Sequence, residues 1–497
     1  MRHFQITLFI TAFILYAGIM GCDSTTTTKK ETITEMPITT SNKEAEASFK
    51  EGLVYFDQGD GLKAKALFAK AIEQDQNMAI AHLYYSFTAT TPKEYNEELA
   101  KAKANLSSAS DWEKDYYDFA LSYNNEDRDK RIAVLEKIAK AYPDAARAHL
   151  NLGQGYEENN EFAKAREHYQ KAIDLNSKWV RGYYSQAYSY LFSIPKDFKK
   201  AEENAIKAGA IAPGSAGIQI LLGDCYRAQD SMQKAQVAYD NAVKIAPDLP
   251  EAYYKRGHTY SFTGKMNEAR ADYAMAGKLD QSMSGAILNI ANTYLYDNNV
   301  AAALQYYNGE IKKLDSSKSS PSVNNLIKLS SLQSIASIAL HIGDTATLQK
   351  AITMRQPLSS EVNVEVGTEE AKITGEASSI YWQALLDALK GNYDAAKTKS
   401  EEMKKKLEPI KNSRKLEDYE FLQGFVSFRQ KDFPGAIAHF EKADQNDIYN
   451  KYWLARANEA GGNADKAKAI YKEVAVYNFN STGFALVRNE AKKKTAM

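Results

Sequence analysis

The sequence predicts an all-α solenoid in which about a dozen helical hairpins stack side by side. Two observations predict it. Small residues recur with spacings of 34, 36, 34 and 34, and a tyrosine follows each of them after three positions. A repeat of this length holds one pair of helices, and one pair cannot bury its apolar face alone. The small residues are Gly153, Ala187, Gly223, Gly257 and Ala291, and the tyrosines are Tyr156, Tyr190, Tyr226, Tyr260 and Tyr294.

A second ladder of alanines has the same spacing and marks the second helix of each hairpin. Within one unit, Ala235, Tyr239 and Ala242 stand at i, i+4 and i+7, which is a single helix face. We expect the small residues to let the two helices of a hairpin approach closely, with aromatic rings filling the space between successive hairpins. Much of the excess of 32 tyrosines over four tryptophans is therefore predicted to be core.

Composition argues against several classes of function. Lys and Arg number 63 and Asp and Glu also 63, so the chain lacks the basic field expected of a nucleic-acid-binding protein. The seven histidines are scattered singly, and the two cysteines, Cys22 and Cys225, cannot build a disulfide framework. No phosphate-binding or dinucleotide-binding glycine motif occurs. We therefore expect no metal, no cofactor and no nucleic acid.

The N-terminal residues are predicted to be a targeting segment rather than part of the fold. An uncharged run from Phe4 to Gly21 has the apolar centre of a signal peptide, which we assign to residues 1–21. Its end, Ile19-Met20-Gly21-Cys22, resembles the lipobox of bacterial lipoproteins. That resemblance implies that Cys22 is lipidated and anchors the chain to a membrane of the cell envelope. The alternative is an uncleaved anchor helix with an incidental cysteine.

The repeat itself resembles a known family. A 34-residue period with small, aromatic and proline positions in this order, with Pro213 and Pro247 closing their units, is similar to the tetratricopeptide repeat, TPR. The resemblance implies a right-handed superhelix whose concave surface binds a protein or peptide. Residues 36–40 and 477–481 also resemble the ends of a family of bacterial TPR lipoproteins. That likeness implies an envelope location and supplies no ligand and no catalytic residues.

We divide the chain by changes in this pattern. Residues 22–40 are predicted to be a Thr-rich flexible tether, and residues 41–315 a first array whose part 79–145 is degenerate. A Ser-rich break near 315–322 separates this array from a partly irregular connecting region, 316–378, with one helical pair. Residues 379–497 are predicted to hold further repeats and a terminal capping helix.

Candidate catalytic residues are few. Ser231 with Lys234, and Ser193 with Lys196, match the Ser-x-x-Lys pattern of penicillin-interacting enzymes, but the companion motifs are missing. Both matches fall at a repeat turn, where helix capping explains the serine. Cys225 precedes a core tyrosine and is expected to be a buried, inert thiol. The prediction is a protein that is not an enzyme.

The first helix of each hairpin is expected to line the concave, binding surface. Aromatic and polar residues placed there are candidates for contacting a peptide or protein, while the alternative is that the rings pack against one another. The candidates are Arg181, Tyr184, Tyr188, Arg227, Tyr254, His258, Asn292 and Tyr296.

The leading hypothesis is a lipid-anchored, non-catalytic scaffold that binds other proteins in the cell envelope. One alternative is glycan capture by a SusD-like lipoprotein, which regular repeats and few prolines disfavour. Tyr184 and Trp382 would then be the residues to test. Another is an outer-membrane assembly scaffold similar to BamD, a TPR lipoprotein of about half this length. The oligomeric state stays open.

Overall fold

The computed structural model describes residues 35–58, 61–124, 128–280, 284–317 and 319–496. Within these ranges the chain forms 25 α-helices and no strand, which confirms the predicted all-α class. The predicted signal peptide and Cys22 lie outside the described residues.

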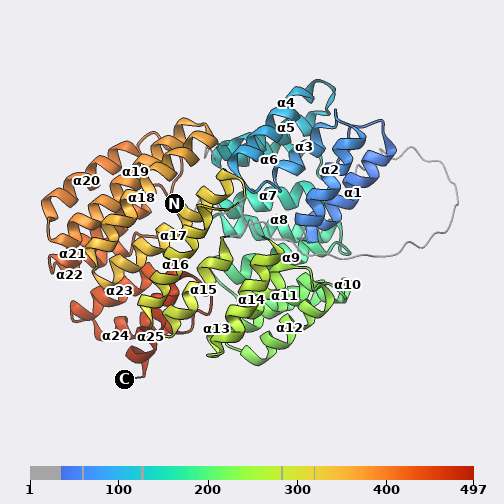
Figure 1. Cartoon of the computed structure of the whole chain (residues 1–497). Helices are drawn as coiled ribbons and strands as arrows, with labels where there is room; N and C mark the ends of the chain where they lie inside the picture. Colours follow the sequence, from blue (N-terminus) through green and yellow to red (C-terminus); the bar gives the residue numbers. More distant parts are fainter. Residues whose placement is uncertain (1–34, 59–60, 125–127, 281–283, 318, 497) are drawn as a thin grey trace.

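The first sixteen helices form eight consecutive antiparallel hairpins (Figure 1). Their bounds are α1 Lys43–Gln58, α2 Gly61–Gln74, α3 Ala79–Ser86, α4 Pro92–Ala104, α5 Asp111–Asn124, α6 Arg128–Ala141, α7 Ala146–Glu158, α8 Phe162–Leu175, α9 Val180–Phe192, α10 Phe198–Ile211, α11 Ala216–Ala228, α12 Met232–Ile245, α13 Pro250–Phe262, α14 Met266–Leu279, α15 Gly285–Tyr296 and α16 Val300–Leu314.

Nine more helices follow the predicted break. They make four hairpins and a single terminal helix, so the described residues contain twelve hairpins, as expected. Their bounds are α17 Pro321–Ile342, α18 Thr345–Val366, α19 Glu369–Lys390, α20 Tyr393–Lys406, α21 Glu417–Arg429, α22 Phe433–Phe440, α23 Ile448–Ala460, α24 Ala464–Ala475 and α25 Thr482–Thr495.

A glycine facing an aromatic ring sets the spacing of the two helices in several hairpins. A methyl group built on Gly257 of α13 would lie 2.6 Å from the ring of Tyr273 on α14, and one on Gly153 would lie 2.6 Å from Tyr169. Both rings are buried. The small residues therefore let the two helices of these hairpins approach closely, as predicted. The aromatic rings that they face lie inside the hairpin, whereas the prediction placed the rings between successive hairpins.

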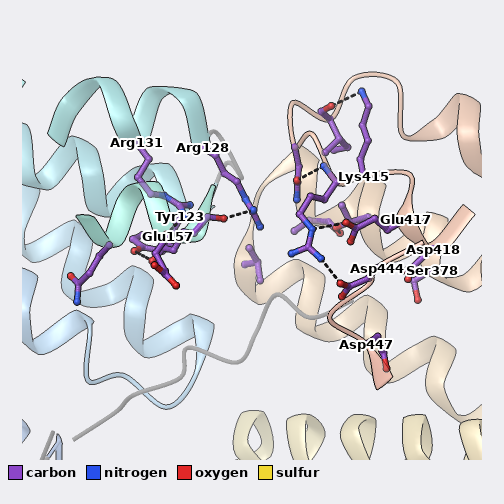
Figure 2. Close-up of a pocket in the computed structure, with 18 of the residues that line it drawn as sticks. Tyr123, Arg128, Arg131, Glu157, Ser378, Lys415, Glu417, Asp418, Asp444 and Asp447 are labelled. Atoms are coloured by element: carbon purple, nitrogen blue, oxygen red, sulfur yellow. Dashed lines mark hydrogen bonds and ion pairs between the residues drawn. The ribbon is translucent and has the colours of Figure 1, made fainter. Parts of the chain in front are cut away.

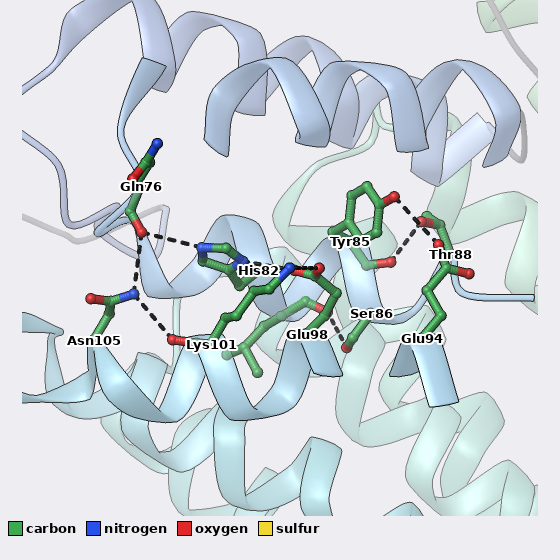
Figure 3. Close-up of polar contacts among 10 residues, drawn as sticks. Gln76, His82, Tyr85, Ser86, Thr88, Glu94, Glu98, Lys101 and Asn105 are labelled. Carbon is green, nitrogen blue, oxygen red and sulfur yellow. Dashed lines mark hydrogen bonds and ion pairs between the residues drawn. The ribbon is translucent and has the colours of Figure 1, made fainter. Parts of the chain in front are cut away.

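The degenerate stretch 79–145 folds as regular hairpins without these ladders. In α3 and α4 a buried polar contact serves instead (Figure 3). His82 Nδ1 lies 2.7 Å from Glu98 Oε2, and Lys101 Nζ lies 2.7 Å from the other carboxylate oxygen. Burial alone would raise the pKa of Glu98, but the hydrogen bonds from His82 and Lys101 outweigh it and lower that pKa. The hydrogen bond between His82 and Glu98 thus joins two helices that lack the glycine contact.

The expectation of an irregular stretch within residues 316–378 is wrong. α17, α18 and α19 are each 22 residues long, and α18 continues through Pro357. Each of the three helices ends at a glycine with positive φ. The residue after that glycine is the N-cap of the next helix. The three glycines, Gly343, Gly367 and Gly391, are 24 residues apart, a period that analysis of the 34-residue repeat overlooks.

The described end of the predicted tether is fixed rather than flexible. Residues 35–40 pack beside α5, where the indole Nε1 of Trp112 donates to the Pro37 carbonyl at 2.6 Å. Thr39 N donates to Glu113 at 3.1 Å, and Thr40 Oγ1 donates to Asp75 at 2.6 Å. Flexibility remains an expectation only for the part of the tether that precedes residue 35.

Two long-range contacts close the array on itself (Figure 1). α25 folds back onto α15 and α17, far from it in the sequence. At the opposite side, the Asn96 amide of α4 donates to the carbonyls of Glu365 and Val366 at the end of α18, at 2.9 and 3.1 Å. The inner surfaces of the first and last hairpins therefore face each other across a shared interior.

We expect Gly257→Ala to lower the free energy of unfolding by about 1–3 kcal/mol, because the added methyl group displaces the buried Tyr273 ring. Gly309→Ala is the control: Gly309 lies inside α16 with open space around it, so alanine should stabilise the helix by roughly 0.5–1 kcal/mol. Urea unfolding followed by circular dichroism measures both. Equal effects of the two substitutions would contradict the packing role of the glycine.

Candidate binding surface

The structure divides the predicted inner-surface residues into two groups. Arg181, Tyr184 and Tyr188 on α9 line a central cavity. The other group contacts residues 477–481, which join α24 to α25 and are called the C-terminal strap below; its members are Arg227, His258, Asn292 and Tyr296. Tyr254 belongs to neither group, because its buried ring packs beside Tyr273 and Gly285.

One end of the strap is held by a buried ion cluster on α11 and α13. The Arg227 guanidinium, 1% exposed, donates to the carbonyl of Asn478 and to Asp224 Oδ1. Lys255 Nζ donates to the second Asp224 oxygen at 2.9 Å. Burial alone would raise the pKa of Asp224, but Lys255 and Arg227 outweigh it and hold that pKa well below its usual range. The carboxylate therefore stays charged and fixes Arg227 toward the strap.

The other end of the strap is held by amides and hydroxyls. The Asn480 amide donates to Asn289 Oδ1 at 2.7 Å, and Tyr296 donates its hydroxyl to Asn480 Oδ1 at 2.6 Å. His258 Nδ1 lies 3.3 Å from the same amide nitrogen. Burial, with Arg227 and Lys255 nearby, lowers the pKa of His258 well below its usual value, so the imidazole is neutral and can accept this hydrogen bond.

Between these two ends, the Phe479 ring fills an aromatic slot. Its centroid lies 5.1 Å from that of Phe192, and the Arg227 guanidinium carbon lies 5.0 Å from it. The inner surface from α9 to α15 therefore already holds a segment of the chain itself that is neither helix nor strand. Sequence reasoning did not foresee this contact, although the alternation Tyr477-Asn478-Phe479-Asn480 marks the strap as unlike its surroundings.

A central cavity of about 940 Å³ is bounded by two walls. The N-terminal wall comprises the lining residues from Phe56 to Tyr188, and the C-terminal wall those from Leu326 to Asn450. Figure 2 shows polar side chains of both walls turned toward the space between them. Among the candidates named from the sequence, Arg181, Tyr184 and Tyr188 lie on the N-terminal wall and Trp382 on the C-terminal wall. The other residues of the C-terminal wall form no motif that could mark them in the sequence.

The N-terminal wall is rich in arginine and tyrosine. Arg147 donates to Asp57 Oδ1 at 2.8 Å, and Arg181 donates to the Asp57 carbonyl at 3.2 Å. The rings of Tyr184 and Tyr188 lie nearly parallel with centroids 6.4 Å apart. The alternative that these rings pack against one another is thus observed, and both rings also remain half-buried at the cavity.

The C-terminal wall carries more acidic than basic groups. Glu417, Asp418, Asp444 and Asp447 line it, with Arg414 and Lys415 as its cations. Arg414 donates to Glu417 at 2.7 Å and lies 3.0 Å from Asp444, and Lys415 donates to main-chain carbonyls. The cavity is therefore bipolar, with its acidic excess on the side of α21 and α23.

The residues considered as catalytic candidates make contacts typical of structural residues. Ser231 stands at the start of α12, although its side chain makes no capping hydrogen bond there, and Lys234 lies over the ring of Tyr226. Cys225 is fully buried, and burial raises the pKa of its thiol.

Within the described ranges, no three His, Cys, Asp or Glu side chains gather closely enough to hold a metal ion. Among the described helices, none is both long and apolar enough to cross a bilayer.

We expect Asn480→Ala to lower the free energy of unfolding by about 1–3 kcal/mol, since Tyr296 and Asn289 each lose a buried partner. The matched control is Asn308→Ala on the exposed face of α16, where the amide bonds only to its own helix at Leu304 among the contacts described. Thermal unfolding measures both. Hydrogen exchange at residues 477–481 should rise in Asn480→Ala alone, and an unchanged exchange rate would contradict the anchoring role.

Comparisons with known proteins agree with this architecture. Models described as tetratricopeptide repeat match residues 146–178, 250–282 and 449–477, and one described as TPR repeat matches residues 223–261. Among curated proteins, the Protein O-mannosyl-transferase TMTC3 of Mus musculus is 26% identical over 203 residues, 41% of this chain and 19% of that protein. The Homo sapiens protein of the same name is 25% identical over 41% of this chain and 20% of its own length. The chain thus spans about a fifth of the length of the curated relatives it matches.

Solved structures that resemble parts of the chain are also repeat proteins. YrrB, described as a TPR protein with an unusual peptide-binding site, is 22% identical, with a TM-score of 0.27 over 36% of this chain and 91% of its own. MamA is 23% identical, with a TM-score of 0.28 over 33% and 94%. A thermophilic TPR protein of Thermus thermophilus is 19% identical, with a TM-score of 0.31 over 38% and 95%. The family matches fall on the hairpins α7–α8, α11–α14 and α23–α24, and the chain is a tetratricopeptide repeat protein.

Proposed function

We propose that this protein is a non-catalytic scaffold that binds a polypeptide segment of a partner protein on its inner surface. The C-terminal strap is the observation that carries the proposal. It is a segment of the chain without helix or strand, held against α9–α15 by arginine, asparagine, histidine and aromatic side chains. The central cavity is also lined by arginine, asparagine and aromatic side chains, which a segment from another chain could contact.

We further propose that the protein is anchored to a bacterial membrane through a lipid on Cys22 and works in the cell envelope. The lipobox-like sequence before Cys22 supports this proposal. The docking of residues 36–40 against α5 would then make the short segment 22–35 the only link between the anchor and the folded body. The partner would approach within reach of a membrane.

Glycan capture receives less support from the cavity. Tyr184 and Trp382, the residues that would stack on sugar rings, lie on its opposite walls. Trp382 is only 3% exposed, so its face is already covered by protein. An aromatic platform for a sugar needs an open ring face, and the cavity offers half-buried tyrosines instead.

The binding proposal is tested by selecting a peptide library on the immobilised full chain. Peptides that are enriched should bind Tyr184→Ala/Tyr188→Ala at least tenfold more weakly, because both rings line the cavity. Tyr226→Ala is the control. That half-buried ring lies outside the cavity and contacts the Lys234 ammonium group instead. No enrichment above an unrelated repeat protein, or enrichment on a polysaccharide panel instead, would refute the proposal.

The anchoring proposal is tested in a bacterium that expresses the full chain. We expect a mature protein that begins at acylated Cys22, detected by mass spectrometry and by incorporation of labelled palmitate. Cys22→Ser should abolish the label, whereas Cys225→Ser should retain it, because Cys225 is buried. A mature mass that still includes residues 1–21 would instead support the uncleaved anchor helix.

A further inference from the structure

Two histidines that lie 19 positions apart in the sequence contact each other in the hairpin of α7 and α8. His149 Nδ1 on α7 lies 3.2 Å from His168 Nδ1 on α8. The two ring planes are inclined by only 15°, and their centroids are 5.4 Å apart. Because the nitrogens are much closer together than the centroids, the two imidazoles meet edge to edge, with their Nδ1 atoms turned toward each other.

The second contact of His149 determines which of its nitrogens carries hydrogen. His149 Nε2 lies 3.0 Å from the Pro143 carbonyl, which can only accept, so Nε2 is the donor. Burial lowers the pKa of His149 and that of His168, so both rings are neutral at neutral pH. His149 Nδ1 therefore presents a lone pair, and His168 donates its Nδ1 hydrogen to it.

These contacts are also those of a histidine that binds a metal. A ligating histidine usually donates its other ring N–H to a carbonyl or carboxylate, which orients the ring and keeps the ligating nitrogen unprotonated. His149 has this support from Pro143 and is only 3% exposed, so its ring is held in place. His168 is half-buried beside the ring of Tyr156, at a centroid distance of 5.5 Å, and is therefore accessible from solvent.

Packing of the hairpin does not require the two histidines. They stand four positions before the ladder glycine and one position before the ladder tyrosine. The same two positions hold Gln219 and Ala238 in α11–α12, and Tyr253 and Asp272 in α13–α14. All three hairpins close with the same contact between a glycine and a tyrosine ring. The pair therefore has no role that the repeat architecture demands.

Two ligands in a line restrict the class of metal ion. Zinc sites have three or four protein ligands, and no third His, Cys, Asp or Glu of the described chain lies close enough to supply one. Imidazole also binds copper, and Cu(I), like Ag(I), accepts two nitrogen ligands in a linear arrangement. Metal–imidazole bonds of about 2 Å place these nitrogens about 4 Å apart, so the 3.2 Å contact must widen by about 0.8 Å. Movement of the half-buried His168 ring provides this, while His149 stays bonded to Pro143.

We propose that His149 and His168 form a linear, two-coordinate site for Cu(I), with Nδ1 of each ring as a ligand. Binding requires one tautomer change: the hydrogen on His168 Nδ1 leaves to solvent, and Nε2 of the same ring takes one up. Both rings stay neutral, no net proton is released, and the copper keeps its oxidation state. Neither histidine lines the central cavity, so this site is independent of the proposed polypeptide-binding function.

The first experiment measures the affinity for Cu(I) by competition with the chromogenic chelator bicinchoninate. Every sample is the full chain with Cys22→Ser and Cys225→Ala, kept anaerobic with ascorbate, so that no thiolate competes for the ion. We expect the chain with both histidines to bind one Cu(I). Failure to take Cu(I) from the chelator at any ratio would overturn the proposal.

Substitutions in the pair locate the site. His149→Gln and His168→Ala copy the residues that α11–α12 carries at these positions, so the hairpin should stay folded, as circular dichroism checks. Each should weaken Cu(I) binding at least tenfold, because one of two ligands is lost. His439→Gln on α22, whose ring contacts Glu420, is the control and should leave the affinity unchanged. Unchanged affinity in both pair variants would refute the site.

X-ray absorption at the copper edge tests the geometry without any substitution in the pair. Linear two-coordinate Cu(I) gives an intense pre-edge feature, which we expect together with a first shell of two nitrogens. A first shell that contains sulfur, or three or more ligands, would contradict the proposed site.

Thermal unfolding tests the choice of ion. Ag(I), added as nitrate in chloride-free buffer, should raise the melting temperature of the chain with both histidines but not of His168→Ala, because the ion binds only the folded state in which the two nitrogens meet. Zn²⁺ at the same concentration should give a smaller rise. An equal or larger rise with Zn²⁺ that depends on His168 would overturn the assignment to a monovalent ion.

Discussion

The contact between an aromatic ring and a glycine on the facing helix is the constraint on which the architecture depends. Because Gly257 has no side chain, the two helices of its hairpin can approach closely around the buried ring of Tyr273. The repeated contact gives successive hairpins a common shape, and a common shape lets them stack into one continuous curved wall. The inner surface is thus a product of packing inside each hairpin.

The local part of this structure could be predicted from the sequence, and the long-range part could not. The spacing of Ala235, Tyr239 and Ala242 matches the helical period and therefore predicts a buried helix face. No such period links Asn96 to Glu365, or Arg227 to Asn478, which are separated by 269 and 251 residues. A proline normally interrupts a helix, yet α18 continues through Pro357, and the repeated Gly343, Gly367 and Gly391 mark the ends of the three 22-residue helices.

The same distinction explains the outcome for the candidate site. Repeat register alone predicts which first-helix positions share a face, and Arg181, Tyr184 and Tyr188 of that set line the cavity. Their partners were not predictable: Tyr296 meets Asn480, whereas Tyr184 borders the cavity. The C-terminal wall could not be predicted because Gln333 and Asp418 belong to no sequence motif. They line a common wall only in the folded chain, where the array closes on itself.

The strap has a consequence for synthesis of the chain. The groove of α9–α15 is complete by residue 296, but the residues that fill it, 478–480, are translated almost two hundred positions later. Until then, Phe192 lacks its ring partner and the Asp224–Arg227 cluster lacks the carbonyl it binds. A chain that ends before residue 477 therefore leaves this inner surface without the segment that covers it.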